Sequence, residues 1–303
     1  MDPERESLSK TRKATIVASA VALCLVVIKI SVGIGSGAMV LIASAVDSGL
    51  DFMVSMFNFL AVRTSEKPSD HKFNYGRGKV EGLASFVEGL VIAISSLVIV
   101  ITAIYKIVHA KTLIQTTPAV VVMIISTLLT ACLVIYLRKV AKKTGSLVIK
   151  ADSLHYQMDL YTNLGILVAL AIISQTGWHL VDPIISIGIA IYMIVTSWEL
   201  VRDGMDMLLD HALPAEMTAQ IEEMIPTVSD KINSFHELKT RHSASVNFVD
   251  VHLVFQRDIS LMEAHRISDR VEQKITDLQD CTWVINCHMD PIDDSHKDKA
   301  KGP

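Results

Sequence analysis

Residues 38–62 read AMVLIASAVDSGLDFMVSMFNFLAV, an apolar run of membrane-spanning length that nevertheless contains Asp47 and Asp51. A second pair, His155 and Asp159, lies in another apolar run at residues 153–173. Both pairs are spaced i, i+4, so the two side chains of each pair project from one face of a helix. Because an aspartate near the bilayer centre costs roughly 2.5 to 3.5 kcal/mol, these carboxylates indicate a functional site inside a membrane.

The two pairs are expected at similar depth. With a rise of about 1.5 Å per residue, Asp47 and Asp51 lie about 14 to 20 Å into a span that begins near residue 38. His155 and Asp159 lie about 10 to 17 Å into a span that begins near residue 148. This depth argues against two simpler interpretations, a polar patch that packs helices and a solvated helix end. Three carboxylates and one imidazole are ligands for a divalent metal ion, so the sequence predicts a four-ligand metal site at mid-membrane.

The composition supports a membrane protein with several spans. Half of the 303 residues are hydrophobic and the mean hydropathy is +0.41, which is too apolar for an ordinary soluble protein. Residues after about 208 are polar and contain no further span. The apolar stretches of about 20 residues predict six membrane helices, at approximately residues 14–34, 38–62, 82–105, 117–137, 153–173 and 180–201.

The positive charges of the loops predict the orientation. Fourteen Lys and Arg residues lie in the N-terminal tail and in segments 63–79 and 138–150, against two in the loops on the other side. We therefore expect both termini in the cytoplasm of a multi-pass inner-membrane protein, with no cleaved signal peptide. The four cysteines are then expected to be thiols. A net charge of −4 gives no indication of nucleic-acid binding.

The polar C-terminal part predicts a small α+β domain. A helical pattern follows Pro214, an alternating strand pattern covers residues 249–255, and the segment 235–241 could pair with it. Residues 260–278 show an apolar helical face, and 283–285 would form a last strand. The order α-β-β-α-β predicts a ferredoxin-like sandwich with helices on one face of a sheet. The expected domains are thus 1–207 in the membrane and 208–291 in the cytoplasm, followed by a disordered tail at 292–303.

Histidines are frequent in this domain. Any one of them is more often a surface or hydrogen-bonded residue than a ligand. Five within about fifty residues favour a metal cluster. His236-Glu237 is not a zinc-protease motif, because Thr240 stands where the second histidine would be. Cys287-His288 lacks the spacing for haem attachment.

The combination of Asp-x-x-x-Asp in span two, His-x-x-x-Asp in span five, six spans and an α+β domain resembles the cation diffusion facilitator family. The resemblance is to its bacterial zinc and iron efflux branch and covers about residues 10–291. The stretches that support it are residues 44–48 (SAVDS), 76–81 (GRGKVE), 151–155 (ADSLH) and 209–214 (LDHALP). Each motif alone is weak, and together they are specific.

The resemblance implies a homodimeric secondary transporter, not an enzyme, that exchanges cytoplasmic Zn²⁺ for protons, with Cd²⁺ or Fe²⁺ as other cargoes. It implies a transport site of Asp47, Asp51, His155 and Asp159. It also implies a binuclear cytoplasmic site that reinforces the dimer, with Asp290 as the bridge; its ligands would be His236, His252, His265, His288 and Asp290. An ion pair between Lys79 and Asp210 would interlock the dimer near the membrane surface.

One departure from the family pattern concerns the loop between spans two and three. Relatives often bind a metal there with an aspartate and two histidines. In this chain Asp70 matches, but Phe73 and Arg77 stand at the histidine positions. His71 is close by, yet the fixed charge of Arg77 disfavours a cation. We expect this loop site to be weak or absent.

Glu88, in the third span, has no role that the resemblance supplies; it could face a cytoplasmic cavity together with Glu81, one heptad earlier. Three other classes of protein remain open at this point. A membrane metalloenzyme would need a general base or nucleophile beside the metal, and no such motif is present. A metal-binding scaffold would bind without transport, and a channel would conduct metal down its gradient regardless of pH.

Overall fold

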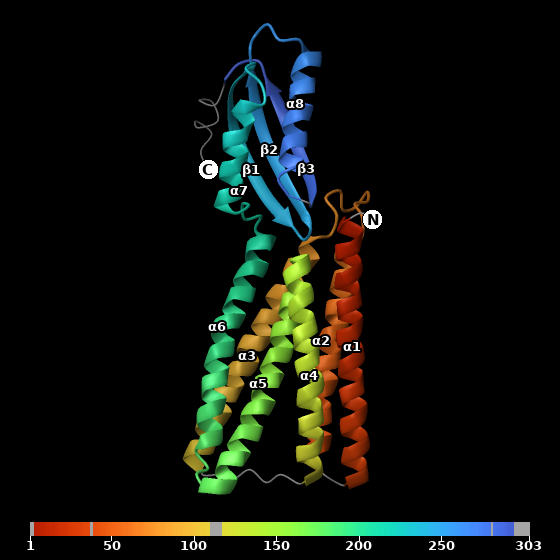
Figure 1. The fold of residues 1–303 in the computed structure, drawn as a ribbon, viewed down its shortest axis with the longest axis vertical. Helices are drawn as coiled ribbons and strands as arrows, with labels where there is room; N and C mark the ends of the chain where they lie inside the picture. Colours follow the sequence, from red (N-terminus) through yellow and green to blue (C-terminus); the bar gives the residue numbers. More distant parts are fainter. Residues whose placement is uncertain (1–2, 37–38, 110–116, 280, 294–303) are drawn as a thin grey trace. The chain divides into compact units, whose positions relative to one another are not determined.

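The structure of the chain is a computed structural model that describes residues 3–36, 39–109, 117–279 and 281–293 (Figure 1). The chain divides into two compact units. One comprises residues 6–205, and the other comprises residues 206–303 together with the first five residues. Most of the predicted C-terminal tail, from residue 294 onward, lies outside the described residues.

The first unit consists of six long helices, and all six are long and apolar enough to cross a membrane. This confirms the prediction of six spans. Each helix extends beyond the apolar stretch that predicted it, because the polar flanks continue the helical hydrogen bonding. The helices are α1 (Pro3–Ser36), α2 (Met39–Ser65), α3 (Lys79–His109), α4 (Thr117–Thr144), α5 (Leu147–Thr176) and α6 (Val181–Leu208).

Helix α5 is the centre of this unit. Its eight consecutive residues from 151 to 158 are all buried, although an amphipathic helix buries only one face. The helix packs against α2, α3 and α4. Its start is fixed by Ser146, whose side chain accepts a hydrogen bond from the Ile149 amide, and its end by Gly177 in the left-handed region at φ 69°. His155 therefore lies in the middle of the helix bundle.

Helices α3 and α6 approach each other closely through glycine. A Cβ atom at Gly204 on α6 would lie 2.7 Å from the Gly82 carbonyl oxygen and 2.8 Å from the Phe86 nitrogen on α3. At Gly89, farther along α3, a Cβ would lie 2.8 Å from a Val201 methyl group. Small residues at such crossings allow helix backbones to approach in a membrane protein.

The second unit has the predicted order of elements, and the predicted fold class is confirmed. It contains α7 (Ala215–Met224), a 3₁₀ turn (Ile225–Thr227), β1 (Ile232–Ser243), β2 (Val246–Phe255), α8 (Leu261–Thr276) and β3 (Thr282–Asp290). In the sheet, β2 lies between β1 and β3, antiparallel to β1 and parallel to β3. All three strands are longer than the segments that the sequence indicated.

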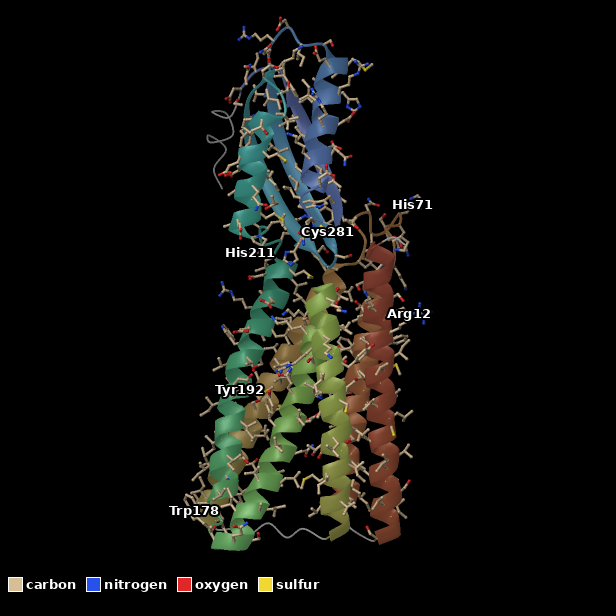
Figure 2. All side chains as sticks on the ribbon, in the orientation of Figure 1. Arg12, His71, Trp178, Tyr192, His211 and Cys281 are labelled. Carbon is tan, nitrogen blue, oxygen red and sulfur yellow. The ribbon has the colours of Figure 1, made fainter. Side chains whose placement is uncertain are left out.

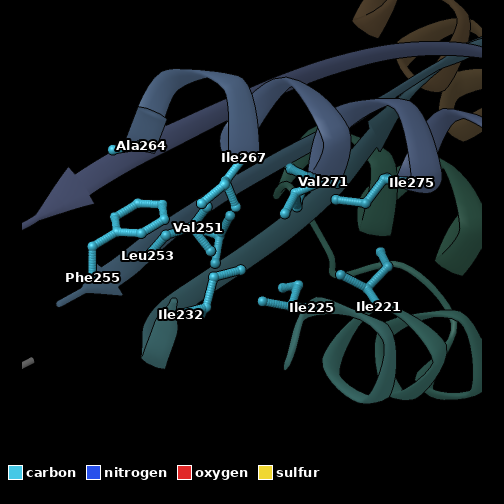
Figure 3. Packing of buried hydrophobic residues seen from close by; sticks show 11 residues of the cluster. Ile221, Ile225, Ile232, Val251, Leu253, Phe255, Ala264, Ile267, Val271 and Ile275 are labelled. Atoms are coloured by element: carbon cyan, nitrogen blue, oxygen red, sulfur yellow. The ribbon is translucent and has the colours of Figure 1, made fainter. Parts of the chain in front are cut away.

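Both helices cover one face of this sheet. The core joins Ile221 of α7, Ile267 and Val271 of α8, and alternate residues of β2 such as Val251 and Leu253 (Figure 3). Because successive strand residues point to opposite faces, Asp250, His252 and Val254 project from the other face. The polar side chains that the strands present together are therefore on the face without helices.

Candidate functional site

Three of the four residues predicted for the membrane site come together between α2 and α5. Ligand atoms of Asp51, His155 and Asp159 all lie within 4.8 Å of one another. The Nε2 atom of His155 is 3.2 Å from Oδ1 of Asp51. The His155 side chain is 8% exposed and that of Asp51 is 21% exposed, so the group is largely shielded by the bundle. Two oxygen ligands and one nitrogen ligand at this spacing suit a divalent transition-metal ion.

Asp47 is not part of this close group. It lies one helical turn before Asp51 on α2, about 6 Å along the helix axis, and it is exposed. For Asp47 to complete a four-ligand site, its side chain must turn toward Asp51. The prediction of a fourth ligand therefore remains a prediction.

Lys29, which was not predicted from the sequence, lies beside this group. Its ammonium donates hydrogen bonds to the Ser48 hydroxyl at 2.6 Å and to the Ser44 carbonyl at 3.4 Å. Ser48 stands between Asp47 and Asp51 on α2, so Lys29 supplies a positive charge next to the carboxylates. A lysine within a span costs about as much as an aspartate, and that cost was a signal in the sequence.

A second polar group joins α2, α3 and α5. The side-chain amide of Asn58 donates to Glu88 at 3.0 Å and to Asp152 at 3.2 Å. Glu88 is thus buried against α2 and α5. Glu81, which the sequence analysis placed with it on a cavity, is also buried: it accepts hydrogen bonds from the Ser146 hydroxyl and the Val148 amide at the start of α5. Glu81 therefore caps a helix.

The histidines of the second unit meet because they are neighbours across the sheet. His236 of β1 pairs with His252 of β2, and His252 pairs with His288 of β3. The ring centroids of successive histidines are 5.0 and 4.6 Å apart. Three imidazoles in adjacent strands thus point from the face without helices.

Asp290 lies close to all three of these histidines. Its Oδ2 atom is 2.9 Å from Nδ1 of His252 and 3.4 Å from Nε2 of His236. Its Oδ1 atom is 3.3 Å from Nε2 of His288. One oxygen thus faces two histidines and the other faces a third. This donor set fits zinc, which binds imidazole nitrogen and carboxylate oxygen.

Two residues differ from the predicted cluster. His265 is on α8, exposed, with its Nδ1 3.8 Å from Asp269 one turn away, and it is not in the close group. Glu237 was not predicted, yet its carboxylate is 3.8 Å from Nε2 of His252. Glu237 lies in a β1 irregularity with φ 50°, which turns its side chain to the histidine face. A bulge of this kind leaves no clear pattern in a sequence.

The α2–α3 loop uses Asp70 for its own structure. The Arg77 guanidinium donates to Asp70 and stacks 4.3 Å from the Phe73 ring centroid. The Arg77 hydrogen bond and those from the Lys72 and Phe73 amides lower the pKa of Asp70. His71 lies in the same loop (Figure 2). A metal ion here would have to displace Arg77.

The proposed dimer interlock joins residues of different units. Lys79 is the first residue of α3. Asp210 forms an ion pair with Arg241 of β1 at 3.3 Å within the second unit. The Lys79–Asp210 pair stays a prediction.

Two domain families match the chain. The cation efflux transmembrane domain matches residues 15–209, and the cytoplasmic domain of cation efflux proteins matches residues 213–292. The cation-efflux pump FieF of Klebsiella pneumoniae is 37% identical over 279 residues, 92% of each chain. The pumps of the same name from Shigella boydii and Escherichia coli are 34% identical over the same length.

A solved structure of CzrB, a proposed zinc transporter, is 26% identical and covers 26% of this chain and 98% of its own, with a TM-score of 0.24.

Proposed function

The chain belongs to the cation diffusion facilitator family of cation efflux transporters, and from this premise we propose that it exports Zn²⁺ from the cytoplasm in exchange for protons. The observation that carries the proposal is the group of Asp51, His155 and Asp159, whose ligand atoms lie within 4.8 Å of one another between two membrane helices. Ionisable residues inside a membrane commonly mark an ion pathway. The proposal includes Asp47 as the fourth ligand.

Protons compete with the metal ion for the same atoms. A metal ion needs neutral imidazole and ionised carboxylates, so it binds when the site has lost its protons. His155 is the proposed coupling group, because a proton and the metal ion compete for the same imidazole nitrogen. In the inward-facing state the site releases protons and takes the ion, and in the outward-facing state protons displace it.

The energetics require such an exchange. Moving a divalent ion outward against 100 mV, inside negative, costs about 4.6 kcal/mol. Each proton that enters returns about 2.3 kcal/mol per 100 mV and about 1.4 kcal/mol per unit of pH gradient. Two protons per ion cancel the electrical work, and the pH gradient then drives export.

The second unit is proposed to act in the cytoplasm as a metal-binding part of a homodimer. His236, His252, His288 and Asp290 would hold zinc there, with Glu237 beside His252. The proposal leaves out His265, which is on α8 and outside this close group. Bound metal would join the side chains of β1, β2 and β3 through coordination bonds, in addition to the hydrogen bonds of the sheet. With the termini cytoplasmic, this cluster would act either as a sensor that closes the dimer when cytoplasmic metal rises or as a permanent structural staple of the dimer.

The deciding experiment measures zinc flux in proteoliposomes with an imposed pH gradient. The wild-type chain is compared with Asp159→Ala and with Asp70→Ala, which removes a carboxylate from the loop outside the membrane group. We expect flux that follows the proton gradient in the wild type and in Asp70→Ala, and no flux in Asp159→Ala.

Two results would overturn the proposal. Zinc binding without flux would favour a metal-binding scaffold. Flux that follows the zinc gradient and ignores pH would favour a channel. If Cd²⁺ or Fe²⁺ moves faster than Zn²⁺ at equal concentration, exchange stands and only the assignment of the cargo changes.

A further inference from the structure

Asn58, Glu88 and Asp152 form a buried polar group that the transport site does not use. They come from three helices, α2, α3 and α5, and their exposed fractions are 0, 3 and 0%. Asn58 donates one hydrogen bond to each carboxylate. Ser55 donates a third, to Asp152 at 3.2 Å, and its oxygen is 2.7 Å from the Tyr156 hydroxyl. Two carboxylates are thus held together by neutral donors.

Each of the three side chains also has one oxygen without a hydrogen-bond partner in the described part of the chain. These oxygens are Oδ1 of Asn58, Oε1 of Glu88 and Oδ2 of Asp152. The amide of Asn58 cannot turn over to hide its oxygen, because that oxygen would then face both carboxylates. A buried polar group without a partner is costly and needs an explanation, such as a bound ion.

The number of free acceptors and the charge both match a divalent cation. A single proton would make one carboxyl group a donor to one of the other oxygens, and the third would stay without a partner. A divalent cation takes several oxygen ligands at once and balances two carboxylate charges. The three ligand atoms are all oxygen, with no imidazole nitrogen. They therefore suit a hard cation better than Asp51, His155 and Asp159 do.

We propose that Asn58, Glu88 and Asp152 form a second divalent-cation site within the membrane unit, separate from the transport site. Along α2, Asn58 lies seven residues beyond Asp51, about 10 Å toward the basic loop. Along α5, Asp152 lies three residues before His155, about 4.5 Å in the same direction. An ion from the basic side meets this oxygen site before it reaches the transport site. The site would therefore bind the ion first and pass it on to the transport site. This role rests on the proposed export function, whereas the binding of a cation by the three residues does not.

The test uses the full-length chain with the other candidate sites disabled. The background carries Asp51→Asn and Asp159→Asn at the transport site and Asp290→Asn in the histidine cluster. Mn²⁺ is the probe because it prefers oxygen ligands, and electron paramagnetic resonance counts the free ion. We expect about one bound Mn²⁺ per protomer, and at least tenfold weaker binding when Glu88→Gln or Asp152→Asn is added.

Glu81→Gln is the matched control. Glu81 is a second buried glutamate on α3, but its carboxylate is bound by Ser146 and Val148 at the start of α5. This variant should lower the thermal midpoint and leave Mn²⁺ binding unchanged. Glu88→Gln is close to isosteric and retains the bond from Asn58. A melting curve shows whether Glu88→Gln still folds. If it does not fold, the Mn²⁺ affinity of Asp152→Asn is the test of the site.

In the chain with an intact transport site, Glu88→Gln should lower kcat/KM for zinc flux at least threefold. No residual Mn²⁺ in the background, or residual Mn²⁺ that Glu88→Gln and Asp152→Asn do not weaken, overturns the site. A Glu88→Gln variant that alters only the pH dependence of flux, without residual Mn²⁺, would make the pair a proton carrier instead. If wild-type flux is present and residual binding absent, only this inference fails. If residual Mn²⁺ binds but the wild-type chain shows no flux, the second cation site stands and the export proposal fails.

Discussion

Lys29 places an ammonium group beside the carboxylates that would receive the metal ion. Its ammonium is held by Ser48, between Asp47 and Asp51. A cation and this ammonium repel each other, so Lys29→Met should tighten equilibrium zinc binding about tenfold, which corresponds to about 1.4 kcal/mol. Turnover should fall, because release becomes slower. Isothermal titration and flux measure the two effects.

Lys29→Arg is the control for this charge effect. It retains the charge and a donor for Ser48, so its zinc affinity should stay within about twofold of the wild type. Weaker zinc binding in Lys29→Met would mean that Lys29 organises the ligands instead of opposing the ion.

Cys287 of β3 is expected to be unreactive in the folded chain. Burial, followed by the negative charges of Glu272 and Asp269, raises its pKa to about 12. At pH 8 roughly one thiol in 10,000 is then ionised, against about a quarter of a free cysteine with a pKa near 8.5. In a variant whose other cysteines are serine, iodoacetamide should label Cys287 at least a hundredfold more slowly in the native state than in urea. Equal rates would contradict the burial of this thiol.

At the scale of elements, the contact between α3 and α6 depends on Gly204. Alanine there would place a Cβ 2.7 Å from a backbone oxygen of α3, which cannot move without shifting the helix. We expect Gly204→Ala to destabilise the chain by about 1 to 3 kcal/mol. Gly188→Ala is the control on the same helix, since a Cβ at Gly188 meets nothing within 4 Å. Gly188→Ala should be neutral or stabilising by up to about 1 kcal/mol. Thermal unfolding in detergent compares them, and equal midpoints would exclude the close contact.

The elements themselves were largely predictable, and their side-chain partners were not. Apolar length decides a membrane helix, so all six spans were found. Alternation located β2, and with it the face of His252. The strand register that joins His236, His252 and His288 arises from packing of the opposite face, which the sequence does not encode locally.

In the membrane site, too, the side-chain contacts could not be predicted from the sequence. The i, i+4 spacing placed the two side chains of each pair on one face of a helix, without fixing which rotamers bring Asp51, His155 and Asp159 together. Glu88 and Asp152 belong to different helices, so only the packed bundle could bring them to Asn58.

At the scale of the whole molecule, the histidine cluster should link zinc to stability and assembly. One carboxylate oxygen of Asp290 lies near His252 and the other lies near His288. A metal ion bound at each oxygen would therefore link β2 to β3. A ligand at 100 times its Kd stabilises the state that binds it by about 2.7 kcal/mol. Zinc added to the full-length chain in detergent should therefore raise the thermal midpoint by several degrees and raise the dimer fraction in sedimentation.

His252→Ala should abolish both zinc effects, because His252 is the central member of the cluster. His242→Ala is the matched control: His242 lies on β1, paired with Asn247 of β2, and is outside the close group of His236, His252 and Asp290. A permanent staple requires that chelators destabilise the purified wild-type chain before any zinc is added. A sensor requires instead that the added ion binds with micromolar affinity and changes the dimer. If His252→Ala and His242→Ala respond equally to zinc, the cluster is neither a staple nor a sensor.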